Sequence, residues 1–283
     1  MPGDPALHER LERLAGAHRL VVVAGLPGTG KSLLIHQLAH LAAGAGRVIH
    51  TLQWDVARPV FEASEAGRRY PPVDGVTHAM VRKAVGLWSR RALVDWDRRH
   101  AAPAHLLIAE APFVGGRLVE LAVRAADDAE PLLAGPACRF VIAVPSAEVR
   151  RFVEAERELR ATRPLHPRER EDAPPQVLRD LWRELHGAAL RLGITAERRD
   201  DAPYDPDVYR RVYESLLRHR RVEAVRLDTV LPTSTLSVYD FGVPRADLVP
   251  REDEAGAAMR EAEARYPDAT ALARDVERWW DTG

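Results

Sequence analysis

Residues 25–32, Gly-Leu-Pro-Gly-Thr-Gly-Lys-Ser, match the pattern G-x-x-x-x-G-K-[ST] of a phosphate-binding P-loop. The apolar run at 20–24 precedes them as a predicted buried strand, and leucines at helical spacing follow in 33–41. Glycines in such a turn allow successive backbone N–H groups to converge on phosphate oxygens, and the start of the helix adds positive potential. The stretch therefore predicts a nucleoside triphosphate site; the alternative is a strand-turn-helix whose glycines serve packing alone.

Two side chains of this stretch have distinct predicted roles. Lys31 reaches the β- and γ-phosphates, and the Ser32 hydroxyl is a ligand for Mg²⁺. Only two of the 41 basic residues are lysines, which makes Lys31 stand out in an arginine-rich chain. The predicted nucleotide-binding residues are Gly25, Pro27, Gly28, Thr29, Gly30, Lys31 and Ser32.

The composition is that of a globular protein with a real core. The chain has 283 residues, 46% of them hydrophobic, and a formal net charge of −1, so nothing demands a nucleic-acid or membrane partner. Cys138 is the only cysteine, which excludes an internal disulfide and fits a reducing cytoplasm. No signal-peptide pattern or apolar run of membrane-spanning length is present. We therefore expect a cytoplasmic protein.

Short apolar strands alternate with helices along the chain, which predicts an α/β fold with a parallel sheet covered on both faces. The predicted strands are 20–24, 47–52, 106–109, 140–144 and 222–227, with a further short strand at 236–239. The predicted helices are 6–18, 31–41, 76–100, 117–126, 146–162, 176–192, 206–219, 252–266 and 269–281. Residues 55–75 are rich in helix breakers.

The predicted domain organisation is one P-loop domain over residues 1–234 and a mainly helical extension over 235–283. Within the first, a lid is expected at about 150–175 and a helical insertion at about 176–220. Ligands of such sheets lie at the carboxyl ends of the strands. Residues that directly follow the strands are therefore the candidates for chemistry.

Asp55 and Arg58 follow the second predicted strand. An Asp at this place is positioned to take the proton from an attacking hydroxyl, and Arg58 to hold an anionic group on the acceptor. The alternative is that Asp55 caps a helix and Arg58 is a surface residue. Trp54 beside them either faces an acceptor ring or fills the sheet edge.

Glu110 ends the third predicted strand, where a carboxylate commonly contacts Mg²⁺; alternatively it only ends the strand. The next residue is Ala111, so the Asp-Glu pair that hydrolytic ATPases use at this point is missing. The chain also has no Asn, which excludes the Asn-Lys-x-Asp motif of GTPases and makes GTP a less favoured nucleotide than ATP.

Arginines follow the fourth predicted strand on a helix. Arg157 and Arg160 are helical neighbours, and Arg163 continues the row. Such a row is suited to a lid that excludes water and contacts phosphates. In a chain this rich in arginine, a solvated helix face is the alternative.

Together, the loop, Asp55-x-x-Arg58, Glu110 and the arginine-bearing helix resemble P-loop kinases of small molecules and nucleic-acid ends. The likeness covers about 18–165 plus 222–228, and is greatest to the polynucleotide 5′-kinase, zeta-toxin and antibiotic-phosphotransferase type. It implies a three-layer sandwich with a five-stranded parallel sheet in the order 2-3-1-4-5. It also implies Asp55 as general base and Arg58 as acceptor-binding residue.

The sequence thus predicts an ATP- and Mg²⁺-dependent phosphotransferase. Its acceptor is a hydroxyl on a small molecule or a nucleic-acid end, which no motif identifies, and the oligomeric state is equally unspecified. Two alternatives stay open: an AAA-type or other P-loop ATPase that couples hydrolysis to conformational work, and a non-catalytic nucleotide sensor.

Overall fold

The computed structural model describes residues 5–199, 201–230 and 242–283. Within them, six strands form one parallel sheet with the order β5-β4-β1-β3-β2-β6. The strands are β1 (Leu20–Ala24), β2 (Val48–Gln53), β3 (His105–Ala111), β4 (Cys138–Pro145), β5 (Val222–Leu227) and β6 (Ala246–Asp247). None of the helices in these ranges is long and apolar enough to cross a bilayer.

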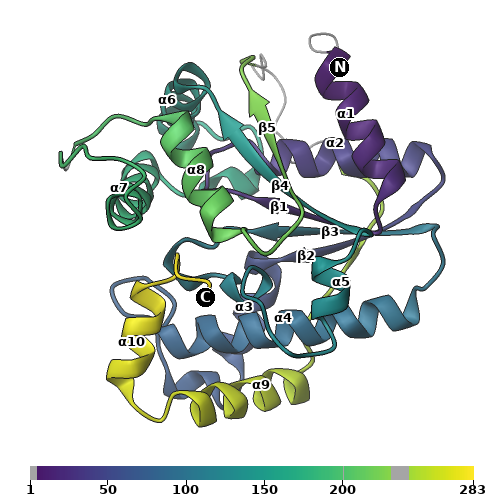
Figure 1. Ribbon diagram of the computed structural model, residues 1–283, viewed down its shortest axis with the longest axis vertical. Helices are drawn as coiled ribbons and strands as arrows, with labels where there is room; N and C mark the ends of the chain where they lie inside the picture. The colour runs from purple at the N-terminus through teal and green to yellow at the C-terminus, as the bar shows by residue number, and fades with distance from the viewer. Residues whose placement is uncertain (1–4, 200, 231–241) are drawn as a thin grey trace.

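Helices cover both faces of the sheet (Figure 1). The main helices are α1 (Pro5–Ala17), α2 (Lys31–Gly44), α3 (Trp54–Ala63), α4 (Ala79–Arg99), α5 (Glu130–Ala134), α6 (Ala147–Thr162), α7 (Pro175–Arg191), α8 (Pro206–Leu216), α9 (Glu252–Arg265) and α10 (Ala269–Glu277). Short 3-10 turns are η1 (Gly67–Arg69), η2 (Val114–Gly116), η3 (Val119–Leu121) and η4 (Pro167–Glu171). The fold is α/β, as predicted from the alternation of strands and helices.

Side chains that alternate along each strand supply two separate cores. In β1, Leu20 and Val22 pack into the core under α4, α8 and α9, whereas Val21 and Val23 pack against α1 and α2. All five side chains of β1 are buried, as expected for a central strand covered on both faces. This burial fixes the strand ends that carry the loop at residues 25–32.

The predicted count of five strands is wrong. Ala246–Asp247 pairs in parallel with His50–Thr51, so β6 adds a strand beyond β2 and changes the order at that edge. Two residues carry too little hydrophobic pattern to be recognised as a strand. The predicted short strand at 236–239 and the predicted boundary at 234/235 lie outside the described residues.

One further local prediction is wrong, and one region rich in helix breakers is helical in part. The predicted helix at 117–126 is instead η3 followed by loop, because Leu118 adopts a left-handed backbone and the segment is held by side chains from elsewhere. The breaker-rich region 55–75 contains α3, which begins at the end of β2 and tolerates Pro59. Pro59 lacks the N–H that would donate to the backbone carbonyl of Asp55. Burial of the apolar face that carries Ala57 and Phe61 compensates for this lost hydrogen bond.

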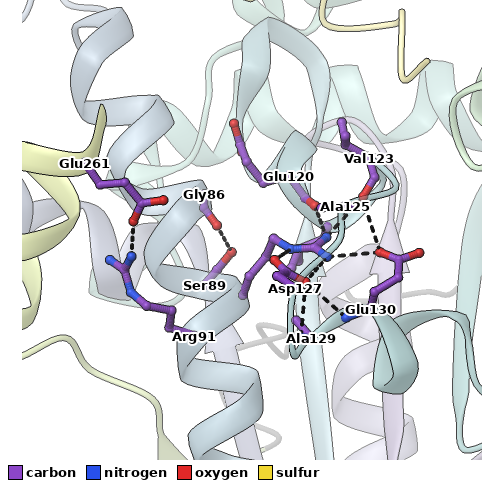
Figure 2. A network of polar contacts seen from close by, with 12 residues as sticks. Gly86, Ser89, Arg91, Glu120, Val123, Ala125, Asp127, Ala129, Glu130 and Glu261 are labelled. Carbon is purple, nitrogen blue, oxygen red and sulfur yellow. Dashed lines mark hydrogen bonds and ion pairs between the residues drawn. The ribbon is translucent and has the colours of Figure 1, made fainter. Parts of the chain in front are cut away.

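A polar network fixes the segment between β3 and β4 to α4. Arg90, with a side chain only 5% exposed, donates to both carboxylate oxygens of Asp127, to Glu130 and to two backbone carbonyls. Figure 2 shows the acceptor residues Glu120, Val123, Asp127 and Glu130 drawn together. Burial opposes ionisation of Glu130, but hydrogen bonds from Arg220, the Ala125 N–H and Arg90 lower its pKa to about 2. The network therefore compensates for the lack of regular structure in this segment.

Arg90→Met should destabilise the fold by about 3 kcal/mol, because it leaves partly buried carboxylates and carbonyls without their donor. The neighbouring Arg91 is the matched control, since its side chain is 45% exposed and pairs with Glu261, whereas that of Arg90 is 5% exposed. Arg91→Met should cost less than about 1 kcal/mol. Urea unfolding of both variants measures the difference, and equal costs would contradict the role given to the network.

Candidate active site

The loop at 25–32 joins the central strand β1 to α2 and turns on glycines with left-handed backbone. Gly28 has φ 72° and Gly30 has φ 83°, values that favour glycine. The buried Thr29 hydroxyl donates to the carbonyl of Leu26 at 2.8 Å. The N–H of Leu26 in turn donates to the Tyr209 hydroxyl of α8 at 3.2 Å. The loop is thus held from inside and from α8.

Lys31 lies at the first position of α2 and points back across this loop. Its Nζ donates to the Leu26 carbonyl at 2.9 Å and lies 3.3 Å from Oε1 of Glu110. Burial lowers the pKa of Lys31, while the carboxylate of Glu110 opposes that shift. Because only 4% of the side chain is exposed, these two acceptors are what keeps its charge favourable. An anion entering the loop would compete for the same ammonium.

Asp55 lies in the first turn of α3, directly beyond β2. Gln53 occupies the N-cap position, so the alternative of Asp55 as a helix cap is wrong. The residue is exposed to solvent overall, but the surrounding protein partly desolvates its carboxylate. That desolvation, followed by repulsion from Glu110, raises the pKa of Asp55. Arg58 and Lys31 oppose this rise, so the four side chains share one electrostatic environment.

Arg58 and Trp54 have structural partners. Arg58 pairs along α3 with Glu62 at 2.8 Å, and Glu62 also accepts from the Thr77 hydroxyl at 2.8 Å. Arg58 is therefore beside Asp55 and already oriented by a carboxylate. Trp54 is 6% exposed and belongs to the core, which excludes the interpretation that it faces an acceptor.

Ser32 and Glu110 supply oxygen atoms at this end of the sheet. Ser32 is the second residue of α2, and Glu110 on β3 lies in register between Val23 of β1 and Gln53 of β2. A hydroxyl and carboxylates are hard oxygen donors of the kind that Mg²⁺ prefers. The donor set at the ends of β1, β2 and β3 thus fits the expected cation.

The three predicted lid arginines have different surroundings. Arg157 lies close enough to Lys31 to lower its pKa, and bonds Ala173 and Asp172 beyond α6. Arg160 pairs with Glu156 one turn back along α6, and Arg163 is exposed at the end of the helix. Only Arg157 is therefore brought to the candidate site.

Arg150 was not among the predicted site residues, yet it connects α6 to the loop. Its guanidinium donates to the Pro27 carbonyl at 3.1 Å and to the Leu178 carbonyl at 2.9 Å, and pairs with Glu154. Only 2% of the side chain is exposed. One arginine among several on an amphipathic helix gives no sequence signal that would distinguish it.

Sequence reasoning also missed Arg82 and Arg117. Arg117 follows a strained loop in which Phe113 has φ 63°, and Gly115 and Gly116 are also left-handed. A Cβ on Gly115 would lie 3.3 Å from Nη1 of Arg117 and 3.4 Å from Nη1 of Arg82, so the two guanidinium groups approach the same point. The Gly115-Gly116 pair just after a strand end was the available signal.

Burial lowers the pKa of both arginines, that of Arg82 to about 10, and the positive charge of Arg117 also lowers the pKa of Arg82. Glu184 of α7 is the carboxylate that opposes these shifts. The carboxylate of Asp55 also raises the pKa of Arg117, whereas the positive charge of Arg58 lowers it. The region beside Asp55 is therefore rich in arginine.

No family model, curated protein or solved structure matches this chain. Functional assignment therefore depends on the chemistry of the site. At one edge of the sheet the fold brings together a buried lysine, two carboxylates and a hydroxyl. An arginine cluster lies on one side of them. This set can bind anions and a hard cation and can accept a proton.

Gly28 provides a structural test of this arrangement. A Cβ there would meet Leu178 at 3.0 Å and Val153 at 3.3 Å, whereas one on Gly46, with a similar φ of 76°, would meet nothing within 4 Å. Gly46→Ala should cost about 1–2 kcal/mol from backbone strain alone. Gly28→Ala should cost about 1–3 kcal/mol more, because it also pushes against α6 and α7. Denaturant unfolding of both variants checks this, and equal losses would show that the loop is not tightly packed under these helices.

Proposed function

We propose that this protein is an ATP- and Mg²⁺-dependent phosphotransferase that moves the γ-phosphate to an acceptor hydroxyl. The observation that carries the proposal is the meeting of Lys31, Glu110 and Asp55 at the ends of three adjacent strands. Lys31 contacts Glu110 at 3.3 Å, and both influence the charge of Asp55. A phosphate-binding group and a proton acceptor are thereby neighbours.

On the donor side, the glycine backbone of residues 25–30 and the start of α2 bind the phosphates. Lys31 exchanges its contacts with Leu26 and Glu110 for the β- and γ-phosphate oxygens. Ser32 and Glu110 hold Mg²⁺, which supplies charge neutralisation on those oxygens. Release of Glu110 from Lys31 would make its carboxylate available for that role.

On the acceptor side, Asp55 takes the proton of the attacking hydroxyl. The acceptor oxygen forms a bond to the γ-phosphorus while the bond from that phosphorus to the bridging oxygen breaks, and ADP leaves. A raised pKa makes Asp55 a stronger base than an ordinary aspartate, because partial burial and Glu110 disfavour its negative charge. Arg58 on the acceptor side and Lys31 on the donor side oppose that rise in pKa.

The arginine cluster supports an acceptor that carries an anionic group. Arg117 and Arg82 converge on one point next to Arg58, and Glu184 is the main carboxylate that offsets them. Positive charges held together in partial burial are unfavourable unless an anion joins them. A phosphate or carboxylate on the acceptor, bound by Arg117 and Arg82, would direct its hydroxyl toward Asp55.

Two helices supply the cover that phosphoryl transfer needs against water. Val153 of α6 and Leu178 of α7 lie against Gly28, and Arg150 joins both helices to the Pro27 carbonyl. Arg157 faces Lys31 from α6 and would add positive charge near the transferred phosphate. We propose α6 and the start of α7 as the lid.

Asp55→Ala should lower transfer by roughly 10²- to 10⁴-fold while ATP affinity stays nearly unchanged, since it removes the base and leaves the loop intact. The assay follows label from [γ-³²P]ATP across hydroxyl acceptors offered with and without a phosphate or carboxylate. Asp128→Ala is the control, because that side chain is 76% exposed and pairs only with Arg98 among the ion pairs of the described residues.

The same panel tests the acceptor class. Arg117→Met should raise KM for the anionic acceptor and leave KM for the uncharged analogue unchanged.

Full transfer by Asp55→Ala would refute the assignment of the base. Phosphate release without any acceptor would favour an ATPase that performs conformational work, and ATP binding without turnover would favour a sensor.

A further inference from the structure

Three histidines from separate elements meet toward the amino-terminal edge of the sheet, away from the loop at 25–32. His50 lies in β2, His105 begins β3, and His100 follows the last turn of α4. Each offers a ring nitrogen, and these nitrogens all lie within 4.8 Å of one another. We propose that His50, His100 and His105 form a site for a divalent transition metal, with Zn²⁺ as the favoured ion.

The geometry is close to that of a three-histidine site. Nε2 of His50 and Nδ1 of His105 are 3.1 Å apart. Two imidazole nitrogens bound to one tetrahedral Zn²⁺ at about 2.0–2.1 Å would lie about 3.3 Å apart. The ring centroids are separated by 4.4 Å for His50 and His100, and by 4.6 Å for His100 and His105. A small movement of His100 would complete the triangle.

Sheet register explains why two of these rings face each other. Val48 of β2 pairs with His105, so His50 is two residues further along the same face of the neighbouring strand. Only 5% of His50 is exposed, while His100 and His105 are half-buried. A bound ion would therefore have one buried ligand, His50, and its fourth coordination position would face solvent, where water can bind.

The backbone around the three rings is held in place by arginines. Arg47 donates to the carbonyls of His105 at 2.8 Å and Pro103 at 3.0 Å. Arg19 donates to the carbonyl of His100 and pairs with Asp97. The Nη atoms of both guanidinium groups thus bind oxygen atoms, and the charges of Arg19 and Arg99 beside His100 would favour water or an anion as the fourth ligand. The backbone that carries His100 and His105 is therefore held before metal binding, which lowers the entropic cost of binding.

The protonation state also suits a metal. Burial, followed by the neighbouring rings of His100 and His105, lowers the pKa of His50 to about 4. In the metal-bound form His50 would bind through Nε2 with its proton on Nδ1. His105 would bind through Nδ1 with its proton on Nε2. With both protons on the outer nitrogens, neutral imidazoles would face the ion.

The full chain is stripped with chelator, and then Zn²⁺ or Co²⁺ is added. We expect one ion per chain, strong visible absorption typical of tetrahedral Co²⁺, and a higher Tm with Zn²⁺. His100→Ala and His105→Ala should each weaken Zn²⁺ binding by about 100-fold or more, exceeding the usual loss from an outer-sphere partner. His8→Ala on the exposed face of α1 is the control and should bind as the parent does.

Two results would overturn the proposal. One is a stripped parent chain that takes up no Zn²⁺ at micromolar concentration. The other is His100→Ala and His105→Ala variants that keep the parent's affinity and Co²⁺ spectrum. A weak octahedral Co²⁺ spectrum would place the ion at the oxygen ligands near Ser32 instead, and would likewise refute the histidine site. Neither test depends on nucleotide chemistry.

Discussion

The contact between Lys31 and Glu110 is the constraint around which the candidate site is arranged. A fully buried ammonium is costly unless acceptors compensate for its lost hydration. Here the compensation comes from the Leu26 carbonyl at 2.9 Å and Glu110 at 3.3 Å. In the proposed function, phosphate oxygens would replace both contacts of Lys31, and a cation would bind Glu110. The same ion pair thus stabilises the loop, and under the proposed function Lys31 would exchange it for phosphate oxygens.

The parallel sheet is what makes this contact possible. β1 and β3 are direct neighbours, and β2 lies next to β3, so residues that follow these strands share one edge. The loop at 25–32, Glu110 and Asp55 occupy that edge. The strained turn at Phe113 then brings Arg117 to the same place, although it costs backbone energy. The charged side chains of the site therefore meet because of the strand order, and not only because of their positions in the sequence.

Much of the fold could be predicted because apolar runs and helical spacing are local signals. Every strand of the central five lies within a few residues of its predicted range, and the loop lies between β1 and α2 as expected. β6 could not be predicted, since Ala246–Asp247 depends on pairing with β2 alone. Asp55 and Glu110 were predictable from their place after strands. Arg150 was not, because its role depends on tertiary contacts in a chain where arginine is common. For Arg117 and Arg82 the only sequence signal was the Gly115-Gly116 pair, which marks a turn but not the arginines that approach it.

The presence of only two lysines, Lys31 and Lys83, allows the most direct measurement. Lysine labelled with ¹³C and ¹⁵N at the side-chain terminus should give two NMR signals, and Lys83→Met assigns them. Lys83 pairs with Glu120 and Asp275 and should be indifferent to nucleotide. The account predicts that Mg²⁺ and ATP shift the Lys31 signal and leave that of Lys83 in place. A Lys31 signal that does not move at saturating Mg²⁺ and ATP would contradict it.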